Sequence, residues 1–470
     1  MKIDAFVNSD DNNKFGLLAL NIKSYIRPFF QMQQPNQRRK SVDDRGRDVI
    51  LIEDDEIDRI SDLPTNVLDI IFKDVPFNEL ARTSVLSKKW RFFWTTHPTI
   101  ILDGDFFEDI SNNAGLVEYD FNNIIDKILL QHLGPIDKFV LDVSTIDIYE
   151  WDLDHWLLYV TKKGVKELTL DNSNQDPYTL PLCIFDCSST FTFLSISNCM
   201  FKPPNPNKVF SNLLELHLKF INFLATHDID APLLTTLTFT SCNRIHFLLF
   251  FASKVENLTI DDSHELQVSF FENFPNVKLL HILISHNLEE DYADGSFITW
   301  SKLLALCPNL TGLCFSNCCV RLLGLEIIPK MFNPEPSQLE HVRLGLEFFD
   351  IDLVSGALSL IRSSPKLRVL QIQALPNSSG QDIEDVLMYL NEPSCVNQPL
   401  EMLQYVELAE FEGTQSELIF LNLMLWKCPS LSQMIIRPSN EVDEADKWKF
   451  FAQVLQSHRA SPTVQILLLP

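Results

Sequence analysis

The stretch LLELHLKF at residues 213–220, followed by LLTTLTFT at 233–240 and VENLTIDD at 255–262, decides the fold. Each stretch contains a Leu-x-Leu type unit, and the first is Leu216-His217-Leu218. Related units stand at Leu168–Leu170 and Leu194–Ile196, so the spacing is about 21 to 26 residues, which is typical of leucine-rich repeats. Since residues two apart share one face of a β-strand, both apolar residues of each unit are predicted to point into a core.

The same unit recurs in the second half of the chain at a longer spacing of about 28 to 36 residues. The later units are Leu280–Ile284, Leu313–Phe315, Val342–Leu344, Leu370–Ile372, Val406–Leu408, Met434–Ile436 and Leu467–Leu469. These repeats have room for a full helix, and Pro308, Pro365 and Pro429 are predicted to end three of those helices. The fold class is therefore predicted as α/β, a solenoid of stacked parallel strands with convex helices. The alternative is a set of unrelated strands in a mixed domain.

A short all-α block is expected before the solenoid. Asp62–Thr65 forms a cap and turn before Val67–Phe72, which has the apolar spacing of a helix. The expected domains are a disordered extension at 1–57, the helical block at 58–104, a connecting segment at 105–164, leucine-rich repeats at 165–400, and a C-terminal region at 401–470 that continues and caps the solenoid.

Composition and motifs exclude several functional classes. The net charge of −25 disfavours nucleic acid and anionic membranes as partners, because both are bound through basic surfaces. We expect no signal peptide and no transmembrane segment, and the scattered cysteines favour a reducing compartment, the cytosol or the nucleus. Cys307, Cys314, Cys318 and Cys319 fit no common zinc spacing, so we expect no metal and no cofactor. The chain lacks the GxSxG, HExxH, P-loop and GxGxxG motifs, so it is not expected to be an enzyme.

Two regions resemble a plant protein family. The residues DRIS-x-LP at 58–64 and RTSVLSKKWRFFW at 82–94 resemble an F-box, and LQYVELAEFEG from Leu403 together with HRASPTVQILLL from His458 resemble an FBD region. The chain is therefore similar to plant F-box/FBD/leucine-rich-repeat proteins over roughly residues 58–470. It departs from their pattern at Thr65-Asn66, where acidic residues are usual, and at Glu410, where glycine often precedes the phenylalanine.

The resemblance implies a function and a first set of site residues. In this family the F-box binds the SKP adaptor of a cullin–RING ubiquitin ligase, and the leucine-rich region binds the protein to be ubiquitinated. The residues implied in adaptor binding are Leu63, Pro64, Val67, Leu68, Ile71, Leu80, Leu86, Ser87 and Trp90. An alternative for Trp90 and Leu68 is that they hold the helical block together, since large buried aromatics dominate small cores.

Two alternative functions stay open. The first is a leucine-rich co-receptor for a small-molecule hormone, which needs clustered inward cations, whereas Lys219, Arg244 and Arg343 are scattered. The second is a scaffold that binds a partner independently of any ligase.

Two further surfaces are predicted from geometry. Residues beside the inward leucines should form the target-binding face of the solenoid: Glu215, His217, Lys219, Thr236, Thr238, Thr240, Asn257, Thr259 and Asp261. The aliphatic run Val49, Ile50, Leu51 and Ile52, followed by four acidic residues, resembles a motif that binds the small ubiquitin-like modifier by strand addition. The alternative is that these aliphatic residues pack onto the helical block.

Overall fold

The computed structural model of the protein describes residues 63–72, 75, 77–85, 90–114, 120–146, 149–173, 176–201, 210–223, 226–263, 268–284, 300–316, 319–320, 338–376, 384–392 and 398–469. The chain divides into two compact units, residues 1–174 and 175–470. The expected extension at 1–57 lies outside the described residues.

The first unit combines short helices with three parallel strands. Its helices are α2 (Thr65–Ile71), α3 (Phe77–Arg82), α4 (Gly104–Ala114), α5 (Asp120–Gln131) and α6 (Glu150–Lys162), with the 3₁₀ helices η2 (Thr83–Val85) and η3 (Trp90–Thr95). Its strands are β1 (Thr99–Leu102), β2 (Lys138–Asp142) and β3 (Glu167–Asp171), which pair in parallel in that order. Two parallel strands thus precede residue 165. Leucine spacing did not reveal them because Ile100 and Phe139 stand where later strands carry leucine.

Aromatic side chains form the core of the helical part. The Phe72 ring lies 5.2 Å from Trp90 and 5.6 Å from Phe93, both edge-on. Phe77 contacts Trp94 in the same way at 6.0 Å. Such edge-to-face pairs stabilise a small core by about 0.5–1.5 kcal/mol each beyond the area they bury.

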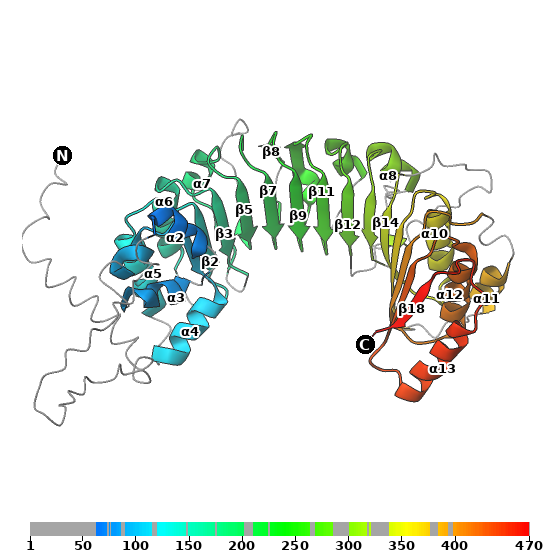
Figure 1. Ribbon diagram of the computed structural model, residues 1–470. Helices are drawn as coiled ribbons and strands as arrows, with labels where there is room; N and C mark the ends of the chain where they lie inside the picture. The colour runs from blue at the N-terminus through cyan, green and yellow to red at the C-terminus, as the bar shows by residue number, and fades with distance from the viewer. Residues whose placement is uncertain are drawn as a thin grey trace, which may run out of the picture. The chain divides into compact units, whose positions relative to one another are not determined.

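The second unit is built on a long parallel sheet. Its strands, in spatial order, are β5 (Phe193–Ser197), β7 (Glu215–Lys219), β9 (Thr236–Thr240), β11 (Asn257–Asp261), β12 (Leu279–Leu283), β13 (Gly312–Phe315), β14 (His341–Leu346), β15 (Val369–Ala374), β16 (Tyr405–Phe411), β17 (Gln433–Pro438) and β18 (Gln465–Leu468). All neighbouring pairs in this series are parallel, and several of the strands are seen side by side in Figure 1. Spatial order follows chain order, so each repeat contributes one strand, and the predicted α/β solenoid is confirmed.

One face of this sheet, here named the covered face, carries the apolar residues of the repeated units. Leu216 and Leu218 are at most 1% exposed, and full burial of one such side chain stabilises the fold by about 1.5–3 kcal/mol. In the shorter repeats this face packs on thin elements, as Phe239 of β9 does on Phe250 of β10, with ring centroids 6.1 Å apart. The thin elements are β4 (Tyr178–Thr179), β6 (Cys199–Met200), β8 (His227–Asp230), β10 (Leu248–Phe251), α7 (Leu182–Asp186), η4 (Ile245–Phe247) and η5 (Val268–Asn273).

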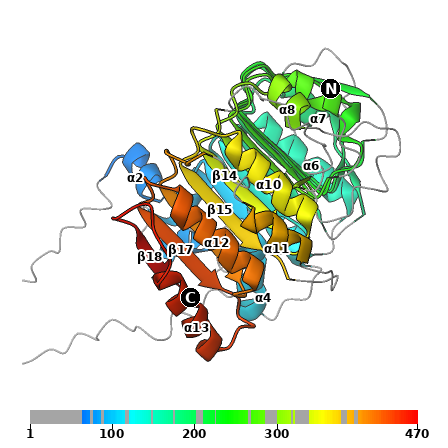
Figure 2. The ribbon, with the colours of Figure 1, turned by 90° about the vertical axis from the view of Figure 1, so that its right-hand side faces the viewer.

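The longer repeats carry full helices on the covered face, as predicted. They are α8 (Trp300–Leu306), α10 (Ile351–Arg362), α11 (Glu384–Asn391), α12 (Gln415–Lys427) and α13 (Glu444–Leu455). Figure 2 shows α10, α11 and α12 in front of the strands β14 to β17. The helices α8, α10 and α12 end just before Pro308, Pro365 and Pro429, so the predicted helix ends are confirmed.

A left-handed residue follows four successive strands of the shorter repeats. Asn198, Phe220, Ser241 and Asp262 have φ of 52°, 54°, 50° and 47°. Each donates its backbone N–H to a carbonyl of the next strand, and the bond from Ser241 to Asp261 measures 2.7 Å. Since L-residues with side chains avoid this region, the repeated hydrogen bond offsets a local cost at every turn.

Candidate functional site

The helix α2 divides the F-box-like residues into an inner and an outer group. The helix starts where the Pro64 carbonyl accepts hydrogen bonds from the N–H groups of Val67 and Leu68, at 3.0 and 3.1 Å. Leu68, Leu80 and Trp90 are 5%, 0% and 6% exposed. These three predicted adaptor residues lie in the core of the first unit, and their placement agrees with the alternative considered for Leu68 and Trp90.

The outer group presents apolar side chains to solvent. Pro64 is exposed, Ile71 is 51% exposed, and Leu63 and Val67 are half-buried. Sequence reasoning missed Ile70, which is 74% exposed. Helical spacing could have found it, because two residues correspond to about 200° and Ile70 therefore points away from Leu68. Leu86 and Ser87 lie outside the described residues.

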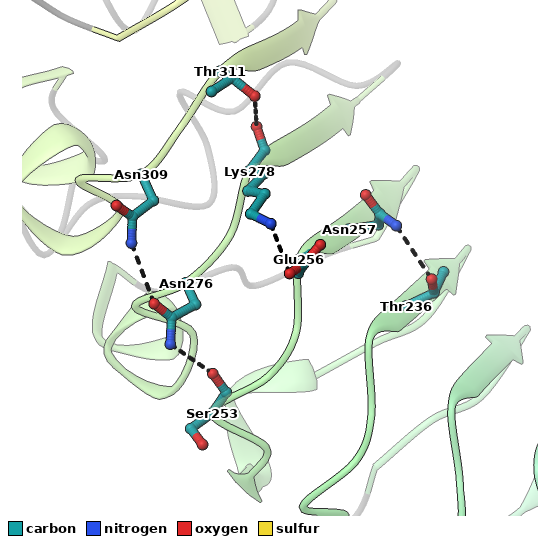
Figure 3. A network of polar contacts seen from close by, with 8 residues as sticks. All are labelled: Thr236, Ser253, Glu256, Asn257, Asn276, Lys278, Asn309 and Thr311. Carbon is teal, nitrogen blue, oxygen red and sulfur yellow. Dashed lines mark hydrogen bonds and ion pairs between the residues drawn. The ribbon is translucent and has the colours of Figure 1, made fainter.

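On the sheet, the side opposite the covered face is here named the open face, and it brings the nine predicted target-binding residues together. Register aligns them in three rows across β7, β9 and β11, namely Glu215–Thr236–Asn257, His217–Thr238–Thr259 and Lys219–Thr240–Asp261. Asn257 Nδ2 donates to Thr236 Oγ1 at 3.3 Å, as Figure 3 shows. His217 Nε2 lies 3.5 Å from the Glu215 carboxylate.

A polar ladder holds neighbouring repeats together where the chain enters the strands (Figure 3). Asn276 Nδ2 donates to the Ser253 carbonyl at 2.8 Å, and Asn309 Nδ2 donates to Asn276 Oδ1 at 3.2 Å. Beside them, Lys278 Nζ contacts Glu256 Oε1 at 2.7 Å. Exposed pairs of this kind contribute up to about 1 kcal/mol each. Their main consequence is geometric, because they help set the stacking of the strands that carry the open face.

A hollow of about 580 Å³ lies further along the open face, across β11 to β15. Only Asp261 of the nine predicted residues lines it. The other polar lining residues include His281, Arg343 and Gln371. The apolar side chains of Leu279 and Leu283, on the same strand as His281, also line the hollow. Burial, and then the charge of Arg343, lower the pKa of His281. Apart from Arg343, which was noted as a scattered cation, sequence reasoning missed these residues, although each occupies the middle of its unit just as His217 does.

Next to the hollow, Glu407 is held by three donors. Arg437 Nε contacts its Oε1 at 2.7 Å, while Gln371 Nε2 and the Tyr405 hydroxyl donate to its Oε2 at 2.8 and 2.9 Å. Burial works to raise the pKa of Glu407, but these hydrogen bonds outweigh it and hold the pKa below its usual value. Glu407 is therefore a fully engaged carboxylate.

No chemistry-bearing cluster stands out elsewhere in the part of the chain that the structure describes. Within those residues, no group of three or more His, Cys, Asp or Glu side chains could hold a metal ion. Cys307 and Cys319 are buried, and burial raises the pKa of the Cys307 thiol to about 11. Cys318 and the predicted modifier-binding run Val49–Ile52 lie outside the described residues. No described helix is both long and apolar enough to cross a bilayer.

Comparisons with known proteins agree with this architecture. The F-box domain family matches residues 60–101, and the At1g61320/AtMIF1 LRR domain family matches residues 128–268. The chain is 30% identical to the Arabidopsis thaliana F-box/FBD/LRR-repeat protein At1g13570, over 88% of this chain and 98% of that protein. It is 25% identical to the F-box/FBD/LRR-repeat protein At5g56420 of the same species, over 87% and 98% of the two chains.

Solved structures are more distant. A crystal structure of a Bacteroides fragilis protein covers 72% of this chain and 84% of its own, at 12% identity and a TM-score of 0.30, too slight a likeness to bear on the fold. The alignments with the two Arabidopsis relatives cover 98% of each relative's own length, and the first relative reaches 30% identity. The chain therefore belongs to the family of F-box/FBD/LRR-repeat proteins.

Proposed function

We propose that the chain is the target-recognition subunit of an SKP–cullin–F-box ubiquitin ligase. In this role it is a non-catalytic adaptor. The F-box within residues 58–104 binds the SKP-type adaptor, and the open face of the sheet binds a protein to be ubiquitinated. The proposal places the chain in the cytoplasm or nucleus, reducing compartments in which scattered cysteines keep their thiol form.

The observation that carries the adaptor half is the exposed apolar surface within the F-box match. Ile70 and Ile71 are 74% and 51% exposed, although the neighbouring Leu68 is buried. Full burial of one isoleucine side chain against a partner would contribute about 1.5–3 kcal/mol to the free energy of binding, so these exposed side chains favour association of α2 with another protein. We therefore assign Ile70, Ile71 and Pro64 to adaptor contacts, and Leu68, Leu80 and Trp90 to the core beneath them.

Co-expression with an SKP-type adaptor and a cullin tests this assignment. The double change Ile70→Lys and Ile71→Lys should reduce recovery of the adaptor by at least about ten-fold, equivalent to about 1.4 kcal/mol. Leu130→Lys is the matched control, since Leu130 on α5 is 76% exposed but lies outside the F-box match. Full recovery of adaptor by the double variant at equal soluble yield would reject the adaptor half of the proposal.

Target binding by the open face is tested separately. His217→Glu combined with Thr238→Glu places two negative charges in the middle row without touching the covered face. Recovery of ubiquitinated proteins bound to the chain should fall, while recovery of the adaptor stays unchanged. If the chain retains its bound proteins but never recovers a cullin, the ligase-independent scaffold replaces the proposal.

A further inference from the structure

The hollow in the open face has opposite charges at its two ends. Arg343 of β14 lies at one end and Asp261 of β11 at the other. Beside them β12 exposes Leu279 and Leu283, which are 42% and 37% accessible on a face that is otherwise mostly polar in the preceding strands. These two leucines flank His281, which lies in the row of Arg343. Gly312 of β13, which has no side chain, also lines the hollow. The surface therefore combines an apolar floor with a cation and an anion on its two sides.

The Arg343 side chain has no ion-pair or hydrogen-bond partner within the described residues. Its neighbours in register are Cys314 on β13 and Gln371 on β15, and neither carries a compensating charge. The carboxylate one strand further, Glu407, is already engaged by Arg437 at 2.7 Å. The guanidinium is close enough to act on the pKa of Cys314, which burial raises and Arg343 lowers. Arg343 is thus free to make a bidentate contact with an incoming carboxylate.

Asp261 is likewise without an ion-pair partner within the described part of the chain. Its register neighbours are Thr240 and Leu283, and the adjacent Asp262 carries the same charge. Burial, and then Asp262, raise the pKa of Asp261. A cation placed beside Asp261 would offset both effects, because an opposite charge favours the ionised carboxylate.

The distance between these two ends sets the length of a fitting partner. Three strand intervals of about 4.8 Å separate β11 from β14, and Asp261 stands two residues further along its strand than the row of Arg343. The diagonal is about 16 Å, and an extended chain advances about 3.3 Å per residue. Side chains on the same face of an extended chain are an even number of residues apart, so an acidic and a basic side chain about four positions apart would reach both ends, with their flexible stems covering the remaining length.

We propose that this hollow docks an extended segment of the target protein, with an acidic side chain on Arg343, a basic side chain about four residues away on Asp261, and apolar residues against Leu279 and Leu283. The inference deepens the proposed function and rests on it only in taking the occupant to be a protein target. Charge complementarity fixes the chemistry of the segment and decides which of its two charged side chains lies at each end of the hollow.

The test uses three labelled peptide pools and the full chain co-expressed with the adaptor. The pools are Glu-X₃-Lys, Gln-X₃-Lys and Glu-X₃-Gln, capped at both ends, with X drawn from Leu, Val, Ser and Thr. Fluorescence anisotropy measures their dissociation constants. The wild type should bind Glu-X₃-Lys roughly two- to five-fold more tightly than either other pool, because Arg343 is exposed and an ion pair at an exposed site has a modest effect on affinity.

Two variants should give a crossed result. Arg343→Gln should abolish the preference for Glu over Gln and keep the preference for Lys, whereas Asp261→Asn should do the reverse. Misfolding would remove both preferences at once, so it cannot produce this pattern. Lys366→Gln is the matched control, since it removes one positive charge from an exposed residue before β15 that does not line the hollow. It should leave all three constants unchanged.

Several outcomes would overturn the inference. They are equal binding of the three pools by the wild type, absence of binding by any pool, or loss of the same preference in both variants. Binding of free monocarboxylic acids at Arg343 without binding of the peptides would replace the target segment by a small molecule. Recovery of the adaptor is scored on the same samples, so failure of the hollow and failure of the ligase assignment are distinguished.

Discussion

Replacing Glu410 by glycine should stabilise the C-terminal repeats. Glu410 has a φ of 54° and lies where the pairing of β16 with β17 shifts register between Leu408 and Phe411. A β-bulge of this kind adds one residue to one strand and often places a residue in the left-handed region. The Glu410 side chain is exposed, so its removal sacrifices little packing. The left-handed backbone at this bulge is the physical reason to expect glycine to be favoured at this position.

The expected gain follows from two opposing contributions. A left-handed backbone costs an L-residue about 1–2 kcal/mol, and glycine avoids that cost. Glycine also loses more conformational freedom on folding, which costs about 0.5–1 kcal/mol. The net stabilisation expected for Glu410→Gly is therefore about 0.5–1 kcal/mol.

Hydrogen exchange of peptides covering β16 and β17 measures this change locally. The opening constant of these amides should fall roughly two- to five-fold in Glu410→Gly, which corresponds to the expected free energy. Glu410→Ala is the control, since it removes the same carboxylate but keeps the Cβ that opposes the left-handed backbone. Equal protection in the glycine and alanine variants, or faster exchange in the glycine variant, would refute the explanation from backbone strain.

Two further predictions concern a helix cap and a buried histidine. Thr414 caps α12 in a reciprocal box: the Glu417 N–H donates to Thr414 Oγ1 at 3.4 Å, and the Thr414 N–H donates to Glu417 Oε2 at 2.8 Å. Thr414→Ala should therefore destabilise the helix by about 1 kcal/mol. Exchange of the α12 amides checks it, and unchanged protection would contradict it. Burial lowers the pKa of His132 below 6.5 in the folded chain, so the unfolded chain takes up the proton at a higher pH than the folded chain does. The free energy of unfolding should therefore fall as the pH drops from 6.5 toward the pKa of the folded chain. The melting temperature of His132→Gln between pH 7.5 and 5.5 should fall less than that of the wild type, and parallel curves would show that His132 is not responsible.

Much of the second unit could be predicted from the sequence because its pattern is local and repeated. Units such as Leu216–Leu218 and Leu370–Ile372 need only a period of two and a regular interval to be recognised as stacked strands. The strand β2 was not predicted from leucine spacing because an aromatic residue, Phe139, occupies its first inward position. In the helical block the pattern located α2 but did not tell whether Leu68 or Ile70 faces inward, since the two residues are equally apolar and only their packing partners differ.

The sequence by itself determined that this chain forms an F-box followed by parallel-strand repeats, since motif spacing and side-chain alternation are properties of short segments. Tertiary structure alone decided which residues of different repeats share a surface. Asp261 and Arg343 belong to different repeats, and no sequence pattern connects them. They line one hollow only because strand register places β11 and β14 in the same sheet at matching heights. The tertiary structure also decided that the Arg343 side chain has no ion-pair partner among the described residues. The nearest carboxylate along its row, Glu407, forms an ion pair with Arg437 of the following repeat. Register and competition for partners depend on how whole repeats stack, and no single segment contains that information.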